Sequence, residues 1–127
     1  MRERVFSDKV LGKLRAELPG HWRKNPVSAY GRAGTGDIIG CVKGRYVEIE
    51  LKQPGKYTNP AAGLTPLQAR HGIEVITNGG VYVFGDNWLS LKFWLESCLS
   101  ENCEGNLPQH LLLTMLQSRS EESESTS

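Results

Sequence analysis

Two glutamates and a lysine alternate with apolar residues in the segment YVEIELKQPG, residues 46–55. Side chains of a β-strand point alternately to the two faces of a sheet, so Glu48, Glu50 and Lys52 would share one face. The valine, isoleucine and leucine between them would share the other. A polar strand face of this kind either meets solvent or forms a site, and the segment alone leaves both interpretations open.

A second β-rich segment, DIIGCV, precedes this strand and begins with Asp37. The two segments are separated by Lys43 and Gly44, a pair that predicts a tight turn and an antiparallel hairpin. Such a hairpin brings Asp37 close to the end of the next strand, where Glu50 and Lys52 lie. The sequence therefore predicts three ionisable side chains at one end of a sheet.

Two carboxylates beside a lysine are the groups that a Mg²⁺-dependent phosphodiesterase needs. Hard divalent cations prefer carboxylate oxygens and are usually held by one or two carboxylates together with the substrate phosphate. The ion polarises a phosphoryl oxygen and lowers the pKa of a bound water, while a nearby lysine orients that water or neutralises transition-state charge. Leu51 points its side chain to the other face, which leaves its backbone carbonyl as a further metal ligand.

The rest of the chain predicts alternating helices and strands. Apolar residues recur at helical spacing over residues 2–18, and Thr65 with Pro66 predicts the start of a helix that stops at Gly79. Gly72 inside that helix suggests a closely approaching backbone, since glycine costs a helix about 1 kcal/mol relative to alanine. The other predicted elements are a short strand that begins near His21 and enters a loop, a buried strand over 81–84, a helix over 88–100 and an amphipathic stretch over 108–117.

Length and composition fit one compact domain. At 127 residues and 39% hydrophobic content, the chain is long enough for one core and short for two. We expect a mixed sheet with helices on both faces over residues 1–117 and a disordered polar tail over residues 118–127. The three cysteines lack the spacing of a zinc site. No stretch suits a signal peptide or a membrane span, so we expect a cytoplasmic protein.

Basic residues are concentrated in the first part of the chain. Residues 1–70 hold 13 Lys and Arg against 6 Asp and Glu, a net charge of +7, whereas residues 71–127 hold 2 against 8, a net of −6. A basic segment is the electrostatic footprint of a phosphate-binding surface, although solvated loop charge explains each cation taken singly. The candidate DNA contacts are Arg23, Lys24, Arg32, Lys56 and Arg70.

The ordered segments AGTGDIIGCVKGRYVEIELKQPG, LTPLQ and GGVYVF resemble the PD-(D/E)XK nuclease superfamily, and within it the VRR-NUC type of stand-alone phage-type nucleases. The resemblance covers the chain from about residue 3 to about residue 85. It implies a restriction-endonuclease-like α/β fold with an αβββαβ core and extra C-terminal helices. By the same resemblance, Asp37 and Glu50 bind the metal and Lys52 is the catalytic lysine. Gln68 matches a glutamine that faces the active site, although it also fits a capping box with Thr65.

Three further positions bear on this resemblance. Glu3 matches the acidic residue that the family often carries on its first helix and so is a candidate metal ligand, with Glu17 as the competing candidate. Gly36 stands where the family usually has proline before the aspartate, which removes backbone rigidity but no ligand atom. Glu48 stands where relatives tend to have a small or apolar residue, and we interpret it as a surface residue rather than an outer carboxylate of the site.

The function implied by the resemblance is a Mg²⁺- or Mn²⁺-dependent DNA endonuclease. Stand-alone members are associated with cutting branched DNA such as four-way (Holliday) junctions, a task that suits a homodimer. The location would be the cytoplasm of a host cell if the protein is phage-derived. The main alternative is a catalytically inactive nuclease-like module that binds DNA or serves assembly, and another is an RNA or nucleotide phosphodiesterase.

Overall fold

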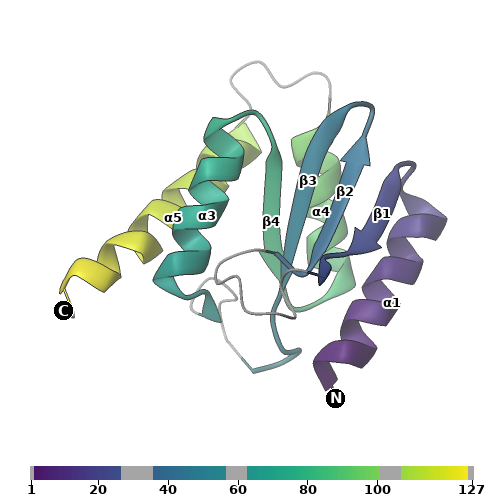
Figure 1. The fold of residues 1–127 in the computed structure, drawn as a ribbon, viewed down its shortest axis with the longest axis horizontal. Coiled ribbons are helices and arrows are strands. Elements are labelled where there is room, and N and C mark those ends of the chain that lie inside the picture. The colour runs from purple at the N-terminus through teal and green to yellow at the C-terminus, as the bar shows by residue number, and fades with distance from the viewer. Residues whose placement is uncertain (1, 27–35, 57–62, 101–106, 126–127) are drawn as a thin grey trace.

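The protein has a mixed α/β fold in which helices and strands are interleaved along the chain (Figure 1). A computed structural model describes residues 2–26, 36–56, 63–100 and 107–125. The helices in this part of the chain are α1 (Arg2–Glu17), α3 (Pro66–Thr77), α4 (Trp88–Leu99) and α5 (Leu107–Ser125). The strands are β1 (His21–Lys24), β2 (Ile38–Val42), β3 (Arg45–Leu51) and β4 (Val81–Gly85). The predicted order of elements is confirmed.

The strands form one mixed sheet in the order β1-β2-β3-β4. β1, β2 and β3 are antiparallel neighbours, whereas β4 lies parallel to β3, and α3 forms the crossover that a parallel pair requires. Lys43 and Gly44 both adopt positive φ, 50° and 82°, as the central residues of a type I′ hairpin turn do. The predicted tight turn between β2 and β3 is therefore confirmed.

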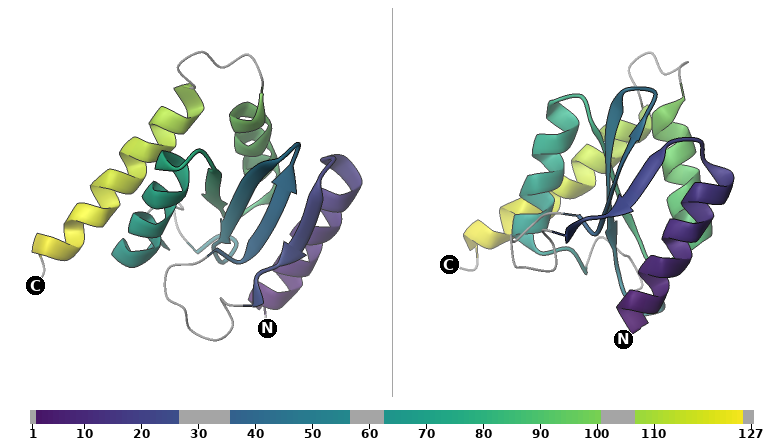
Figure 2. Two further views of the ribbon diagram at one scale, coloured as in Figure 1. Left: turned by 45° about the horizontal axis from the view of Figure 1, so that its top comes forward. Right: turned by 45° about the vertical axis from the view of Figure 1, so that its right-hand side comes forward.

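Helices cover both faces of the sheet, as Figure 2 shows from two further directions. α1 and α4 lie on one face, where Lys92 of α4 donates a 2.8 Å hydrogen bond to Glu17 of α1. α3 lies on the opposite face, and α5 packs along α3. The core beneath α1 and α4 is apolar and includes the buried side chains of Val10, Leu14, Ile38, Val47, Ile49, Val81, Val83, Leu91 and Leu95. The face beneath α3 carries the buried glutamates of β3 as well, so the polar chemistry of the sheet lies on this side.

α3 begins as the sequence predicts. Gln68 donates its backbone N–H to Thr65 Oγ1 at 3.1 Å, and Thr65 donates its backbone N–H to Gln68 Oε1 at 2.9 Å, which completes a capping box. Gly72 is buried in the same helix, and a Cβ atom there would lie 2.6 Å from Cδ2 of Tyr82. The nearest atoms to such a Cβ are therefore side-chain atoms, those of Tyr82 on β4 and of Leu116 on α5, and α5 is the helix that packs along α3.

Gly72→Ala is expected to destabilise the protein by roughly 1 kcal/mol, because overpacking outweighs the gain in helix propensity. The Tyr82 ring is fully buried. Urea denaturation would measure the change. Gly12→Ala in α1 is the matched control, since a Cβ at Gly12 meets nothing within 4 Å, and it should stabilise the protein. Equal stabilisation by both substitutions would contradict the close contact between α3 and β4.

α5 is longer than the sequence predicts. It runs from Leu107 to Ser125, so a helix occupies most of the region where we expected a disordered tail. Leu112 and Leu116 are buried, and Arg119 donates from Nε to the Leu64 carbonyl at 2.6 Å, which ties the polar half of α5 to the turn before α3. Despite the length of α5, no helix in the described residues has both the extent and the apolar character needed to cross a membrane.

Candidate active site

Asp37 lies just before β2, beside the end of β3. Its backbone N–H donates to the Ile49 carbonyl at 2.8 Å, and its carboxylate Oδ2 accepts the backbone N–H of Leu51, also at 2.8 Å. Asp37 is therefore held against β3 by its main chain and by its side chain. The hairpin brings Asp37 to the Glu50–Lys52 end of the strand, as the sequence predicts.

Glu50, Lys52 and Gln68 are joined by a chain of polar contacts. Glu50 is only 4% exposed and lies on the sheet face that α3 covers. Gln68 Nε2 donates to Glu50 Oε2 at 3.2 Å, and Lys52 Nζ donates to Gln68 Oε1 at 2.9 Å while lying 3.6 Å from Glu50 Oε2. Gln68 thus caps α3 and faces the site in the same conformation.

These side chains share one polar pocket of about 230 Å³. At roughly 30 Å³ for each water, this volume takes a phosphate group or several waters. Two lysines and two carboxylates contribute to its wall, together with Leu51 and two glutamines. The lining residues are Asp37, Glu50, Leu51, Lys52, Gln53, Lys56 and Gln68.

Glu50 has an unusual electrostatic environment. Burial, and after it the nearby Asp37 carboxylate, raises the pKa of Glu50 to about 9 against the opposing charge of Lys52. Glu50 Oε1 is buried and has no hydrogen-bond partner among the described residues. A buried carboxylate oxygen without a partner is costly in free energy. The two neighbouring carboxylates are therefore suited to share a proton or a cation.

The donor set fits a hard divalent cation. Asp37 and Glu50 supply carboxylate oxygens, and Leu51, whose backbone carbonyl the sequence predicts as a further ligand, lines the same pocket. The remaining ligands would be water and phosphate, as in many Mg²⁺ sites. Over the described ranges, no group of three or more His, Cys, Asp and Glu side chains is placed to hold a metal ion. The described residues therefore fit an ion that is held by two carboxylates together with the substrate. They do not fit an ion that is coordinated by protein side chains alone.

Glu17, the competing candidate for the helix carboxylate, does not reach this pocket. Its carboxylate accepts a hydrogen bond from Lys92 at 2.8 Å and lies 3.6 Å from Lys13, on the sheet face opposite Glu50. The proposal of Glu17 as a metal ligand is therefore wrong. Glu3 belongs to the first turn of α1, but its side chain lies outside the described residues, and its role stays a prediction.

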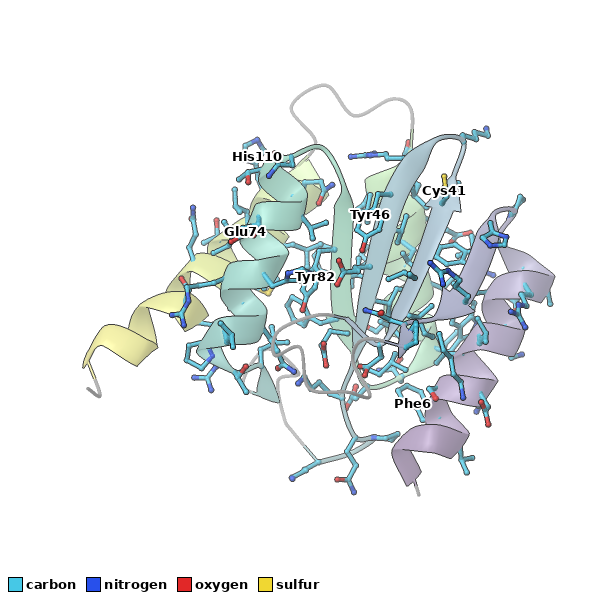
Figure 3. The ribbon with its side chains drawn as sticks, in the orientation of Figure 1. Phe6, Cys41, Tyr46, Glu74, Tyr82 and His110 are labelled. Carbon is cyan, nitrogen blue, oxygen red and sulfur yellow. The ribbon has the colours of Figure 1, made fainter. Side chains whose placement is uncertain are left out.

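Glu48 is buried, at 2% exposure, and the prediction that it is a surface residue is wrong. The reason is that α3 covers this part of the β3 face. Glu48 Oε1 accepts the Gly36 N–H at 2.6 Å, and Oε2 accepts the Tyr46 hydroxyl at 2.7 Å. His71 Nε2 lies 2.8 and 2.9 Å from the two oxygens. Figure 3 shows Tyr46 and Tyr82 on the sheet face that α3 covers, with Glu74 on α3 itself.

Lys56 and Lys24, two of the candidate DNA contacts, lie on different sides of the molecule. Lys56 lines the pocket together with the two carboxylates. Lys24 forms an ion pair with Asp8 of α1 and is aligned with Ile38 and so with the sheet face opposite Glu50. Lys24 therefore does not belong to this pocket, and its contact with DNA stays a prediction.

The other three candidate DNA contacts are less closely tied to the pocket. Arg23 is exposed and shares a sheet row with Glu48, two residues along the strand from the Glu50 row. Arg70 is exposed on α3. Arg32 lies outside the described residues. Arg23 thus lies on the sheet face that carries the pocket, and Arg70 lies on the helix above it. For both, contact with DNA stays a prediction.

No protein-family model matches this chain, and no curated protein matches it.

Sequence reasoning missed His71, although a signal for it was present. Gln68 and His71 are one helical turn apart, a rise of about 4.5 Å, and Glu48 and Glu50 are two strand residues apart, a rise of about 6.6 Å. A helix that lays Gln68 over Glu50 therefore carries His71 close to Glu48. Tyr46 belongs to the same polar strand face and was overlooked because its ring alone predicts only a strand.

Proposed function

We propose that this protein is a divalent-metal-dependent DNA endonuclease with a restriction-endonuclease-like fold. The observation that carries the proposal is the pocket in which Asp37 and Glu50 face Lys52 and in which Glu50 Oε1 is buried without a partner among the described residues. The order α1-β1-β2-β3-α3-β4 supports it, because it matches the expected αβββαβ core, with α4 and α5 as the extra C-terminal helices.

The charge of the pocket favours an anionic substrate once a divalent ion is bound. The ammonium groups of Lys52 and Lys56 balance the carboxylates of Asp37 and Glu50 when all four are ionised. A divalent cation then leaves the pocket with a net positive charge. Positive potential in a confined site attracts phosphodiesters and raises their local concentration.

Each side chain of the pocket has its own part in the proposed reaction. Asp37 and Glu50 hold the ion, which when bound polarises a phosphoryl oxygen and lowers the pKa of a coordinated water. Lys52 donates hydrogen bonds to the phosphate or the attacking water and offsets the negative charge of the transition state. Gln68 keeps Lys52 and Glu50 in place through the two ends of its amide.

A cleavage assay tests this proposal. Purified protein is incubated with supercoiled plasmid, single-stranded DNA, a four-way junction and an RNA, each with Mg²⁺, with Mn²⁺ or with EDTA. We expect DNA cleavage with either metal and none with EDTA. Asp37→Asn keeps the shape of the side chain but removes a ligand charge, and should lower the rate by about 10³-fold or more. Full activity of this variant, or cleavage in EDTA, would contradict the proposal.

The same assay separates the alternatives. DNA binding without cleavage would favour an inactive module, and cleavage of RNA alone would favour a ribonuclease on the same site. The preference for branched DNA, the homodimer and the cytoplasmic location stay predictions, and the panel of DNA shapes addresses the first of them.

A further inference from the structure

A hydrogen-bond network beside the pocket holds the peptide groups on both sides of Gly36. The Gly36 N–H donates to Glu48 Oε1 at 2.6 Å, and the Gly36 carbonyl accepts from Asn25 Nδ2 at 2.9 Å. The Asn25 backbone N–H donates to the Asp37 carbonyl, also at 2.9 Å. The three backbone polar groups that lead into Asp37 and leave it are therefore each bound to a neighbouring segment.

The backbone before Asp37 needs such support because residue 36 is a glycine. It has the greatest backbone freedom of any residue, and rotation about its φ and ψ would swing the carboxylate of Asp37 that follows. A larger residue would also be crowded here, because a Cβ at Gly36 would lie 3.0 Å from Glu48 Oε1 and 3.1 Å from the Ile49 carbonyl. The absence of a side chain at position 36 thus gives Glu48 room to approach this backbone.

Glu48 is itself held in one orientation. His71 Nε2 lies within 2.9 Å of both carboxylate oxygens, and the Tyr46 hydroxyl donates to Oε2. Burial, and after it the hydrogen bond to Glu48, raises the pKa of the Tyr46 phenol above its ordinary value, so the hydroxyl keeps the proton that it donates. A carboxylate with both oxygens engaged acts as a rigid acceptor for the Gly36 N–H.

Glu48 stands outside the pocket of the proposed reaction. The pocket of about 230 Å³ is not lined by Glu48, which instead borders a separate pocket of about 320 Å³ together with His71 and Glu74. Both of its oxygens already accept hydrogen bonds. This arrangement suits a residue that acts through its neighbours and does not suit a ligand of the ion.

We propose that Glu48 is a positioning residue for Asp37: its oxygen accepts the Gly36 N–H and so sets the direction of the Asp37 carboxylate. The inference rests on the proposed function only in taking Asp37 as a metal ligand. What matters is the acceptor atom, and not the negative charge of Glu48.

Three variants separate the acceptor from the charge. Glu48→Gln removes the charge but keeps an oxygen that can accept the Gly36 N–H, while its amide nitrogen can face Tyr46 or His71. Glu48→Leu has no acceptor. Glu74→Gln is the matched control, because it removes an exposed carboxylate from the neighbouring pocket without touching Gly36.

Amide hydrogen exchange reads the position of Asp37 without any metal. The Leu51 N–H donates to Asp37 Oδ2, so its protection reports the carboxylate, and the Lys52 N–H, which donates to the Gly85 carbonyl, is the internal control. We expect Glu48→Leu to speed exchange at Gly36 and Leu51 by about fivefold to tenfold, with Lys52 unchanged. Glu48→Gln and Glu74→Gln should stay within about twofold of the wild type at all three amides, because neither loses the acceptor.

A Mn²⁺ titration provides the second readout. Glu48→Leu should bind Mn²⁺ about tenfold more weakly, as the loss of outer partners of metal ligands usually does, and Glu48→Gln should bind nearly as the wild type does. Equal weakening in both variants would show that charge is what matters and would overturn the inference. Unchanged exchange at Gly36 and Leu51 in Glu48→Leu would overturn it as well.

If Glu48→Leu does not fold, a substitution of the half-exposed Tyr46 tests the same inference. Tyr46→Phe removes one partner of Glu48 and should speed exchange at Gly36 in the same direction by a smaller factor, and no change would overturn the inference. A wild-type protein that binds no Mn²⁺ would overturn the proposed function, whereas the amide exchange would still decide whether Glu48 positions Asp37.

Discussion

Lys52→Met is expected to lower the rate of DNA cleavage by about 10²–10³-fold with little change in DNA affinity. The Lys52 side chain is 11% exposed, and its ammonium is held 2.9 Å from Gln68 Oε1, so it is directed into the pocket instead of outward to solvent. Its charge is most valuable when negative charge builds at the phosphate, and such an interaction raises kcat more than it tightens binding. Steady-state kinetics at saturating Mg²⁺ would separate kcat from KM.

Two further substitutions make this result specific. Lys52→Arg keeps the charge, but a planar guanidinium does not reproduce the position of an ammonium between Gln68 and Glu50, so this variant should also be impaired. Lys92→Met removes the same charge on the opposite face of the sheet and should cleave at the wild-type rate. If Lys52→Met weakened DNA binding as much as it slowed cleavage, Lys52 would be a DNA contact and not a catalytic residue.

The parts of the fold that depend on neighbouring residues could be predicted from the sequence. Lys43 and Gly44 specify a hairpin turn through their positive φ angles, and Thr65 with Gln68 specifies the start of α3. The same local rules place Asp37 beside Glu50, since a tight turn sets the register of the two strands that it joins. The core of the candidate site therefore follows from short-range signals.

The features that could not be predicted depend on what packs over a strand. The alternation in β3 tells that Glu48 shares a face with Glu50, but it does not tell that α3 covers that face and buries Glu48. The end of α5 is a similar case, because its helix depends on contact with α3 and on the hydrogen bond from Arg119 to Leu64. For Arg23 and Lys24 the sequence did hold the signal, because consecutive residues of a strand point to opposite faces and only one of the two can share the face of Glu50.

Glu50→Gln is expected to stabilise the metal-free protein at high pH while it abolishes cleavage. The pKa of Glu50 is about 9 in the folded protein, raised first by burial and then by Asp37, against a value of 4.5 for an unperturbed glutamate. Between these values the folded protein binds more protons than the unfolded chain, so stability falls as pH rises through this range. Glutamine carries no charge at any of these pH values, so the variant does not pay the cost of burying an ionised carboxylate. Urea denaturation of both proteins in EDTA at pH 5 and pH 9 would measure the difference in stability.

A divalent ion should reverse this order of stability. Mn²⁺ compensates the buried charge of ionised Glu50, so the wild type should gain about 2.7 kcal/mol when the free ion is at roughly one hundred times its Kd. Glu50→Gln lacks the ligand charge and should gain little.

Two further variants test the cause of the raised pKa of Glu50. Asp37→Asn removes its second-largest cause, so the stability of this variant should fall less steeply with pH than that of the wild type. Glu74→Gln should behave as the wild type does. A wild-type stability that is flat between pH 5 and pH 9 and unaffected by Mn²⁺ would mean that Glu50 is neither strained by its burial nor relieved by an ion, and the proposed metal site would lose its physical basis.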